Sequence, residues 1–281
     1  MPELPEVEVT RRGVAPHIEG RVVEGAVLRR EGLRWPFPPG LSELLAGRRI
    51  IATGRRGKYL LIEFEHGTLI VHLGMSGHLR VLPPGIEPRK HDHFDLVGAD
   101  PEAGPSSRQV LRLHDPRRFG AVVWAAGEDD PAAHKLLKNL GPEPLDGLFP
   151  FDAFFAGLQA SRAPVKLLLL SGKIVVGVGN IYASEVLFLS GIRPTARASS
   201  IGPIRARRLH AAIQQVLARA VERGGSTLRD FSSADGNAGH FQVEANVYGR
   251  DQQPCRVCGT PIRLLRQGQR STFYCIRCQR G

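Results

Sequence analysis

Residues 255–278 read CRVCGTPIRLLRQGQRSTFYCIRC and contain every cysteine of the 281-residue chain. Their spacing, C-x2-C-x16-C-x2-C, is typical of a four-thiolate zinc site. Residues 249–281 are too few to bury a hydrophobic core, so a bound metal would have to stabilise them. Two disulfides are the alternative, which a reducing cytoplasm disfavours. Because four protein ligands leave no open position for catalysis, we predict one structural Zn2+ and no organic cofactor, with the ligands Cys255, Cys258, Cys275 and Cys278.

Positive charge is concentrated in the second half of the chain. The whole sequence has 38 Lys and Arg against 27 Asp and Glu, a net charge of +11. Residues 1–130 contain 18 of each sign, so residues 131–281 carry the entire excess. The predicted zinc finger, residues 249–281, alone has seven Arg and one Asp. Zinc ribbons also occur as plain structural elements, so the finger by itself does not identify a ligand. A high-GC genome would explain the use of Arg but not the scarcity of acids. The asymmetry therefore indicates a polyanionic partner, most commonly nucleic acid.

The composition excludes several classes of protein. Hydrophobic residues make up 42% and charged residues 23%, which excludes a wholly disordered chain. The most apolar stretch, residues 165–192, is interrupted by Lys166, Lys173 and Glu185, so it lacks the roughly 18 uncharged residues of a transmembrane helix. The N-terminus has neither the basic nor the apolar region of a signal peptide. We expect a soluble, cytoplasmic, monomeric protein with no membrane partner.

The pattern of short elements predicts an α+β chain with several domains. Residues 1–130 are predicted to form an antiparallel β-sandwich with flanking helices, beginning with a helix that has Pro5 at its first position. Residues 131–150, rich in Pro, Gly and Asp, are a predicted linker. Residues 151–248 are a predicted helical domain ending in a loop at 226–248, and 249–281 form the finger. Strands are expected at 22–28, 50–53, 59–65, 68–73, 79–82, 94–97, 109–113 and 121–124. Helices are expected at 152–158, 165–170, 180–189 and 203–223.

The N-terminal residues offer a nucleophile. We expect Met1 to be removed before the small Pro2, which leaves a secondary α-amine. An α-amine titrates near 7.7–8.0 against about 10.4 for Lys, so much more of it is neutral at pH 7. Such an amine can attack a sugar aldehyde and form an iminium, with Glu3 beside it as a proton donor. The alternative is a proline-initiated helix with acids at its positive end, and this segment alone favours that alternative.

Other segments are ambiguous when each is considered alone. Lys58 follows a basic turn that would ordinarily be a solvated surface feature. His91 and His93 form an H-x-H pair, a weak metal pattern. The run 177–180, Gly-Val-Gly-Asn, lacks the third glycine of a dinucleotide fingerprint. It leads into a predicted helix whose N-terminus can bind phosphate, with Asn180 as the N-cap.

Three further side chains are of the types that fill a gap in a base stack. Arg117 can donate hydrogen bonds to a base, while Met75 and Phe119 can act as apolar wedges. We expect Arg117 and Phe119 to point to opposite sides of an extended loop. A core position would be the default for Met or Phe.

Together, the motifs resemble those of the bacterial formamidopyrimidine-DNA glycosylase family, also called 8-oxoguanine DNA glycosylases. The similarity covers essentially the whole chain. The matching segments are PELPEVE, RRGKYLL, HLGMSG, KHDHFDL, DPRRFG, GPEPL, VVGVGNIYASE, GGSTLRDF, VYGR and the CRVCGTPI…QRSTFYCIRCQ finger. The resemblance implies a β-sandwich, a helix–two-turns–helix domain and a zinc finger, with damaged duplex DNA bound between the domains. It also implies removal of oxidised purines, followed by strand nicking through β- and δ-elimination.

The resemblance also implies roles for individual residues in catalysis. Pro2 would be the Schiff-base nucleophile and Glu3 the general acid or base. Lys58 would serve β-elimination and contact phosphate, and Arg270 would serve δ-elimination and clamp phosphate. The loop at 226–248 would cover the everted base.

For DNA binding, the resemblance implies that Met75, Arg117 and Phe119 fill the gap left by the everted base, with Arg117 facing the orphan cytosine. The remaining predicted contacts are to the DNA backbone, by His91, Lys166, Asn180 and Arg162. The segment before Lys166, Ser-Arg-Ala-Pro, has fewer cations than is usual in the family.

Two alternatives stay open at this point. An endonuclease VIII-type enzyme would share the N-terminal proline, the helical module and the finger, but would prefer oxidised pyrimidines. A non-catalytic zinc-ribbon protein would bind damaged DNA without cleaving it.

Overall fold

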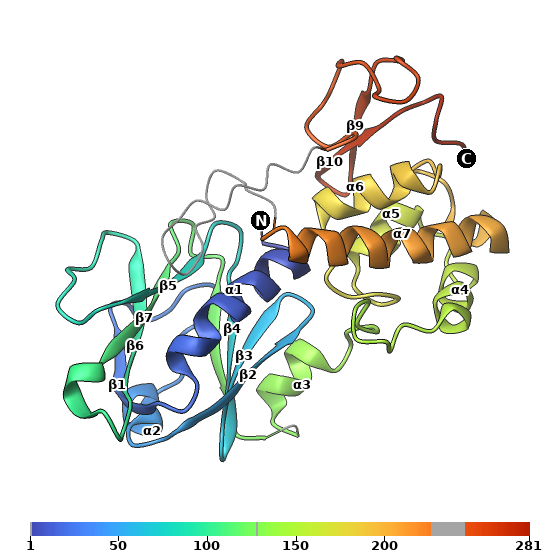
Figure 1. The fold of residues 1–281 in the computed structure, drawn as a ribbon. Helices are drawn as coiled ribbons and strands as arrows, with labels where there is room; N and C mark the ends of the chain where they lie inside the picture. The colour runs from blue at the N-terminus through green and yellow to red at the C-terminus, as the bar shows by residue number, and fades with distance from the viewer. Residues whose placement is uncertain (1, 128, 226–244) are drawn as a thin grey trace. The chain divides into compact units, whose positions relative to one another are not determined.

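Residues 2–127, 129–225 and 245–281 are described in the computed structural model (Figure 1). They form two compact units. The first is built from the chain up to Asn139 together with Gly224 and Gly225, and the second from Leu140–Arg223 and residues 245–281. The predicted α+β fold, with an antiparallel sandwich, a helical domain and a finger, is confirmed. Among the described residues, no helix combines the length and apolar character needed to cross a membrane.

The first unit contains two four-stranded antiparallel sheets, and each of the eight predicted strands is present with small shifts at its ends. One sheet has the order β1 (Val22–Leu28), β6 (Asp92–Ala99), β7 (Gln109–His114), β5 (His78–Leu82). The other has the order β2 (Ile50–Arg56), β3 (Tyr59–Phe64), β4 (Gly67–His72), β8 (Ala121–Ala125).

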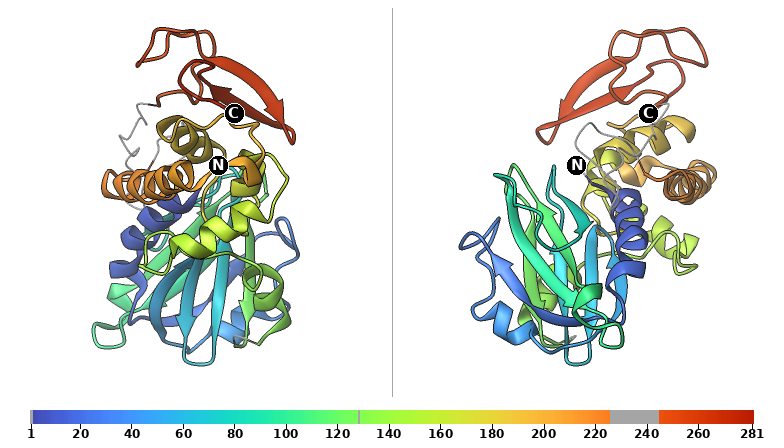
Figure 2. Two further views of the ribbon diagram at one scale, coloured as in Figure 1. Left: turned by 90° about the vertical axis from the view of Figure 1, so that its right-hand side faces the viewer. Right: turned by 60° about the vertical axis from the view of Figure 1, so that its left-hand side comes forward.

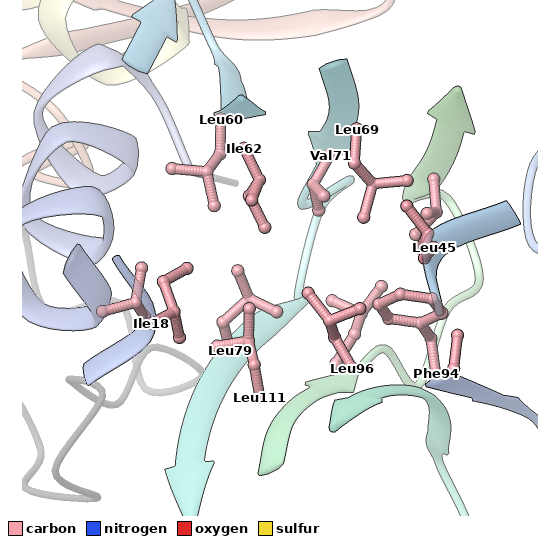
Figure 3. Packing of buried hydrophobic residues seen from close by; sticks show 14 of the residues in the cluster. Ile18, Leu45, Leu60, Ile62, Leu69, Val71, Leu79, Phe94, Leu96 and Leu111 are labelled. Atoms are coloured by element: carbon pink, nitrogen blue, oxygen red, sulfur yellow. The ribbon is translucent and has the colours of Figure 1, made fainter. Parts of the chain in front are cut away.

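The core of the first unit lies between these sheets. Figure 3 shows the inward side chains of β3 and β4 facing those of β5, β6 and β7. Burial alternates along β3, because successive side chains of a strand point to opposite faces of the sheet. Leu60 and Leu69 are completely buried. Each such side chain contributes roughly 1.5–3 kcal/mol relative to an exposed one.

Helix α1 (Leu4–Ile18) packs against strands of both sheets (Figure 2). Its Leu4 and Val14 are completely buried. On the same helix, the Glu8 carboxylate binds the guanidinium groups of Arg11 and Arg12. It also binds the guanidinium of Arg55 on β2, at 3.2 Å. The ion pair with Arg55 connects α1 to the strand that leads into the Lys58 turn.

We predict that Glu8 gives this unit a stability that depends on pH. Burial raises the pKa of Glu8, but hydrogen bonds from Arg11 and Arg12 and the charges of Arg11 and Arg55 outweigh burial and lower the pKa from 4.5 to about 2. A carboxylate with a lowered pKa stabilises the fold above its unfolded-state pKa and loses this effect as the pH falls towards 2. Glu8→Gln should lower the free energy of unfolding by about 2–3 kcal/mol at pH 7 and by much less near pH 2.

Urea unfolding of the wild type and the variant at both pH values measures this difference. Glu43→Gln, on an exposed position of α2 (Leu41–Leu45), is the control and should have little effect at either pH. An equal loss for Glu8→Gln at pH 7 and near pH 2 would contradict the electrostatic explanation.

Helix α3 (Pro131–Leu137) lies within the stretch expected to be a linker. The Asp130 carboxylate accepts a hydrogen bond from the Ala132 N–H at 2.8 Å, and Pro131 occupies the first turn. These are ordinary start signals of a helix. Ala133 is buried against Ile70 of β4, so this helix belongs to the first unit.

The second unit contains the four predicted helices, α4 (Phe151–Gln159), α5 (Val165–Leu170), α6 (Asn180–Leu189) and α7 (Pro203–Glu222). Helix α6 is buried on nearly all sides, whereas α7 buries one face, as its amphipathic sequence predicts. The finger adds a hairpin of β9 (Arg263–Gln267) and β10 (Arg270–Tyr274). A cluster of Phe188, Val247 and Ile262 with the buried cysteines joins the finger to α6.

Candidate functional site

The N-terminus of α1 holds Pro2 and Glu3. Both residues are buried, and Glu3 is the N-cap of the helix. Glu3 and Glu6 form a reciprocal capping box, in which the Glu3 N–H donates to Glu6 Oε2 at 2.8 Å. The spacing of Glu3 and Glu6 is the sequence signal for this box. It fixes the backbone that carries the predicted nucleophile, at the end of the helix where the dipole favours negative charge. Met1 lies outside the described residues.

Lys58 lies in the tight turn between β2 and β3. Gly57 has a left-handed φ of 56°, which suits glycine at this turn. The Arg55 guanidinium donates to the Gly57 carbonyl at 3.2 Å and also contacts Glu8 of α1. One buried arginine therefore connects the Lys58 turn to the helix that begins beside Pro2.

His72, at the end of β4, was not singled out by the sequence. Its ring lies 5.0 Å from that of Tyr59, and its Nδ1 accepts the Gly74 N–H at 3.1 Å. Burial, followed by the charges of Lys58 and Arg34, lowers the pKa of His72 to about 4. His72 is therefore neutral at pH 7 with the proton on Nε2, which makes Nε2 a hydrogen-bond donor. In the sequence, His72 lies at the end of the predicted strand 68–73, which follows the strand that begins beside Lys58, and the structure pairs it with Tyr59.

Two loops of the first unit present the predicted gap-filling side chains. Met75 is 36% exposed and Phe119 is 47% exposed, and Arg117 is exposed as well. The Arg117 guanidinium carbon lies 5.1 Å from the centre of the Phe119 ring. The expectation that these two residues point to opposite sides is wrong, because the loop is not extended here: Arg118 between them has a left-handed φ of 56°, and the two side chains contact each other.

The two loops touch through their backbones at glycines. A Cβ added to Gly74 would lie 2.5 Å from the Gly120 nitrogen and 2.5 Å from the Phe119 carbonyl carbon. Only glycine fits such an approach. The backbone of the Met75 loop therefore packs directly against the backbone of the loop that carries Arg117 and Phe119.

His91 is half-buried and directly precedes β6, and its ring lies edge-on to those of His93 and His114, with ring centres 6.2 and 5.8 Å apart. The Asp92 carboxylate instead binds His114 Nδ1 at 2.7 Å and the Arg80 guanidinium at 2.9 Å. Within the described residues, the four cysteines are the one group of three or more potential ligands close enough together to hold a metal ion. The histidine pair thus gives no support to a second metal site.

In the second unit, Lys166 and Asn180 converge on the finger hairpin. The Lys166 ammonium donates to the Ser271 carbonyl at 3.1 Å and to Thr272 Oγ1 at 2.8 Å. The Asn180 amide nitrogen donates to the same Ser271 carbonyl at 3.0 Å. Both residues therefore hold the strand position next to Arg270, which is exposed.

Lys166 is completely buried, which differs from the implied contact with a DNA phosphate. The physical reason is that α5 directs the aliphatic part of the Lys166 side chain into the core, where its ammonium donates hydrogen bonds to the finger hairpin. Asn180 is the first residue of α6 rather than the N-cap, which is Gly179. Arg162 is exposed, just before α5.

A two-residue turn fixes Arg270 at the start of β10. Gly268 and Gln269 have φ values of 51° and 63°, as in a type I′ hairpin turn. The side chain of Leu167 on α5 lies 3.2 Å from the position of a Gly268 Cβ. The hairpin tip is therefore packed against the helical domain.

The four cysteines form one cluster in the finger. All four Sγ atoms lie within 4.8 Å of one another, and the Cys255–Cys278 and Cys258–Cys275 distances are 3.8 and 3.5 Å. A tetrahedral zinc ion with bonds of about 2.3 Å places its sulfurs about 3.8 Å apart. The donor set therefore fits zinc. The Cys278 N–H donates to Cys275 Sγ at 3.4 Å, the kind of contact that stabilises a thiolate.

Three family models match the chain. The formamidopyrimidine-DNA glycosylase N-terminal domain matches residues 1–122, the H2TH domain of the same family matches 140–232, and the zinc finger found in FPG and IleRS matches 252–281. The formamidopyrimidine-DNA glycosylase of Acidovorax sp. (strain JS42) is 63% identical over 281 residues, covering 100% of both chains. That of Herminiimonas arsenicoxydans is 58% identical with the same coverage.

Solved structures of Fpg proteins are similar to this chain over nearly its whole length. The MutM (Fpg) protein of Thermus thermophilus shares 41% identity with a TM-score of 0.87, covering 99% of this chain and 98% of that one. The Lactococcus lactis Fpg bound to abasic-site DNA shares 32% identity with a TM-score of 0.89, covering 99% and 100%. The fold and the finger define a zinc-finger DNA glycosylase of base excision repair. The chain belongs to the formamidopyrimidine-DNA glycosylase family, in which glycosylase and AP lyase activities are combined.

Proposed function

We propose that this enzyme removes 8-oxoguanine and formamidopyrimidines from duplex DNA and nicks the strand through a Schiff base on Pro2. The observation that carries the proposal is the pair of interlocked loops at Gly74 and Gly120, which present Met75, Arg117 and Phe119 from a rigid scaffold. An enzyme that everts a base needs such a filler for the resulting gap. Solved complexes of the L. lactis Fpg contain Fapy-dG DNA and abasic-site DNA, which supports the same substrates here.

In the proposed reaction, the neutral Pro2 nitrogen attacks C1′ of the damaged nucleotide. The base leaves with the electron pair of the glycosidic bond and takes up a proton, with Glu3 as proton donor. The Pro2 nitrogen then loses its own proton, and the sugar ring opens as the C1′–O4′ bond breaks and O4′ takes up a proton, which leaves an iminium between Pro2 and C1′. Loss of the C2′ proton from this iminium breaks the C3′–O bond and expels the 3′ phosphate. Loss of the C4′ proton in a second elimination breaks the C5′–O bond and expels the 5′ phosphate. Lys58 and Arg270 would bind these phosphates and serve the two eliminations, because each is a cation that directly follows a tight turn with a left-handed glycine.

DNA binding would involve both units. His91, Asn180 and Arg162 would contact the backbone, while Lys166 would act by holding the hairpin of Arg270. We propose domains at 1–130, 151–248 and 249–281, with residues 131–150 between the first two contributing α3 to the first unit before they connect to the second. We propose that the enzyme works as a monomer, because a continuous duplex requires no symmetry partner. Its place would be the cytoplasm, on the nucleoid. The loop expected to cover the base falls largely on residues 226–244, outside the described part of the chain.

The substrate preference is testable with two duplexes. Single-turnover excision of 8-oxoguanine opposite cytosine should be at least about tenfold faster than excision of thymine glycol, because the proposal assigns Arg117 to reading the orphan cytosine. A Pro2→Gly preparation controls for contaminating enzymes. Faster release of thymine glycol would indicate the endonuclease VIII type. Tight binding without cleavage of either duplex would indicate a non-catalytic binder.

A further inference from the structure

The loop from Asp115 to Gly120 is closed by its own first residue. Asp115 follows β7 and is completely buried. Its Oδ2 accepts the Gly120 N–H at 2.8 Å, and its carbonyl accepts the Arg118 N–H at 3.2 Å. Its own N–H donates to the His91 carbonyl at 2.9 Å. One buried residue therefore holds both ends of the loop that carries Arg117 and Phe119.

The closed loop contains a strained residue. Arg118 has a φ of 56°, a left-handed conformation that costs a non-glycine residue free energy. Gly120 has no room for a side chain, because a Cβ there would lie 2.7 Å from the His72 carbonyl oxygen and 2.9 Å from Asp115 Oδ2. The loop keeps this shape because the Asp115 carboxylate and the backbone of β4 fix Gly120 from two sides.

Among the described residues, the Asp115 carboxylate accepts its hydrogen bond from the Gly120 backbone. Burial raises its pKa, and the N–H groups of Gly120, Arg118 and Arg117 oppose this increase. Its Oδ1 has no hydrogen-bond partner within the described residues. A buried carboxylate of this kind is costly unless hydrogen bonds satisfy it. Here the hydrogen bond comes from the Gly120 amide, at the far end of the exposed loop.

We propose that Asp115 is the positioning residue of the gap-filling loop. It holds Arg117 and Phe119 in their inserting geometry before DNA binds, so that insertion does not have to order the loop. Through the Gly74–Gly120 contact, the same closure sets the position of Met75. This inference rests on the proposed function, in which these three side chains fill the gap left by an everted base.

The test uses full-length, zinc-loaded enzyme and 8-oxoguanine duplexes with 2-aminopurine beside the lesion. Asp115→Ala should slow the fluorescence change of base eversion by about 30-fold, because misplacing a functional group by about 1 Å can cost up to about 100-fold. Asp115→Asn should slow it by only about threefold to tenfold, because the amide oxygen can still accept the Gly120 N–H. Both variants should reduce discrimination between orphan cytosine and adenine. Cleavage of a preformed abasic site in single-stranded DNA, which has no gap to fill, should stay within about twofold of wild type.

Asp130→Ala is the matched control, because the Asp130 carboxylate also closes a loop of this unit by accepting the Ala126 and Ala132 N–H groups. It should leave eversion unchanged. If Asp115→Ala does not fold, Asp115→Asn alone decides. A folded variant with wild-type eversion and discrimination would overturn the proposal, as would an equal loss on single-stranded abasic DNA. Failure of the wild type to excise 8-oxoguanine would instead overturn the proposed function.

Discussion

Enzyme that retains Met1 should form no covalent complex when borohydride is added with 8-oxoguanine duplex, and Pro2→Gly should reduce trapping at least about 100-fold. The reason is that the proposed nucleophile is the α-amine of Pro2. An amide at that position has no available electron pair. A glycine amine is primary and lacks the ring that holds the nitrogen in one orientation on a buried, capped helix start.

Pro5→Ala is the matched control for this experiment. Pro5 lies in the first turn of the same helix, so its loss perturbs the helix start but leaves the α-amine intact. Trapping should remain within about threefold of wild type, because alanine is tolerated in a first turn. Mass analysis of the N-terminus reports the fraction of chains without Met1. Equal trapping by chains that retain Met1 would place the covalent bond elsewhere, and peptide mapping would then identify the residue, with Lys58 the first to examine.

Removal of zinc should abolish nicking and weaken DNA binding together. Metal binding supplies on the order of 10 kcal/mol to the folding of zinc fingers. The finger has little else, because its small buried cluster includes Cys255 and Cys275 themselves. Cys275→Ser, at a completely buried ligand, should therefore unfold the hairpin that carries Arg270. The sandwich should keep its own stability, because its core contains no finger residue.

Zinc content, limited proteolysis of the finger and strand nicking measure this prediction. Val257→Ser is the control within the same finger, because Val257 lies between the ligands Cys255 and Cys258 but is 72% exposed and is not a ligand itself. It should retain one zinc per chain and near wild-type nicking. Metal-free protein with full nicking activity would show that the finger does not depend on zinc.

Local patterns in the sequence determined the zinc ligands, the eight strands of the sandwich and helices α1, α4, α5, α6 and α7, but not the short helices α2 and α3. The two CxxC pairs lie within one stretch of chain, and strands and helices follow from periods of two and 3.6 residues, so neighbouring residues are sufficient to predict them. Resemblance to a family likewise depends on motifs of a few residues. The N-terminal proline and the arginine-rich finger were therefore recognisable from the sequence alone.

Only the tertiary structure decided how these segments meet. Lys166 and Ser271 are 105 residues apart in sequence, and no local pattern shows that this lysine is buried against the finger hairpin. Likewise, the contact of Gly74 with Gly120 depends on how two strand ends are brought together. The sequence also does not show that the Asp115 carboxylate is buried and closes a loop through the Gly120 N–H. Long-range packing fixes such contacts, and a local sequence pattern carries no information about distances across the fold.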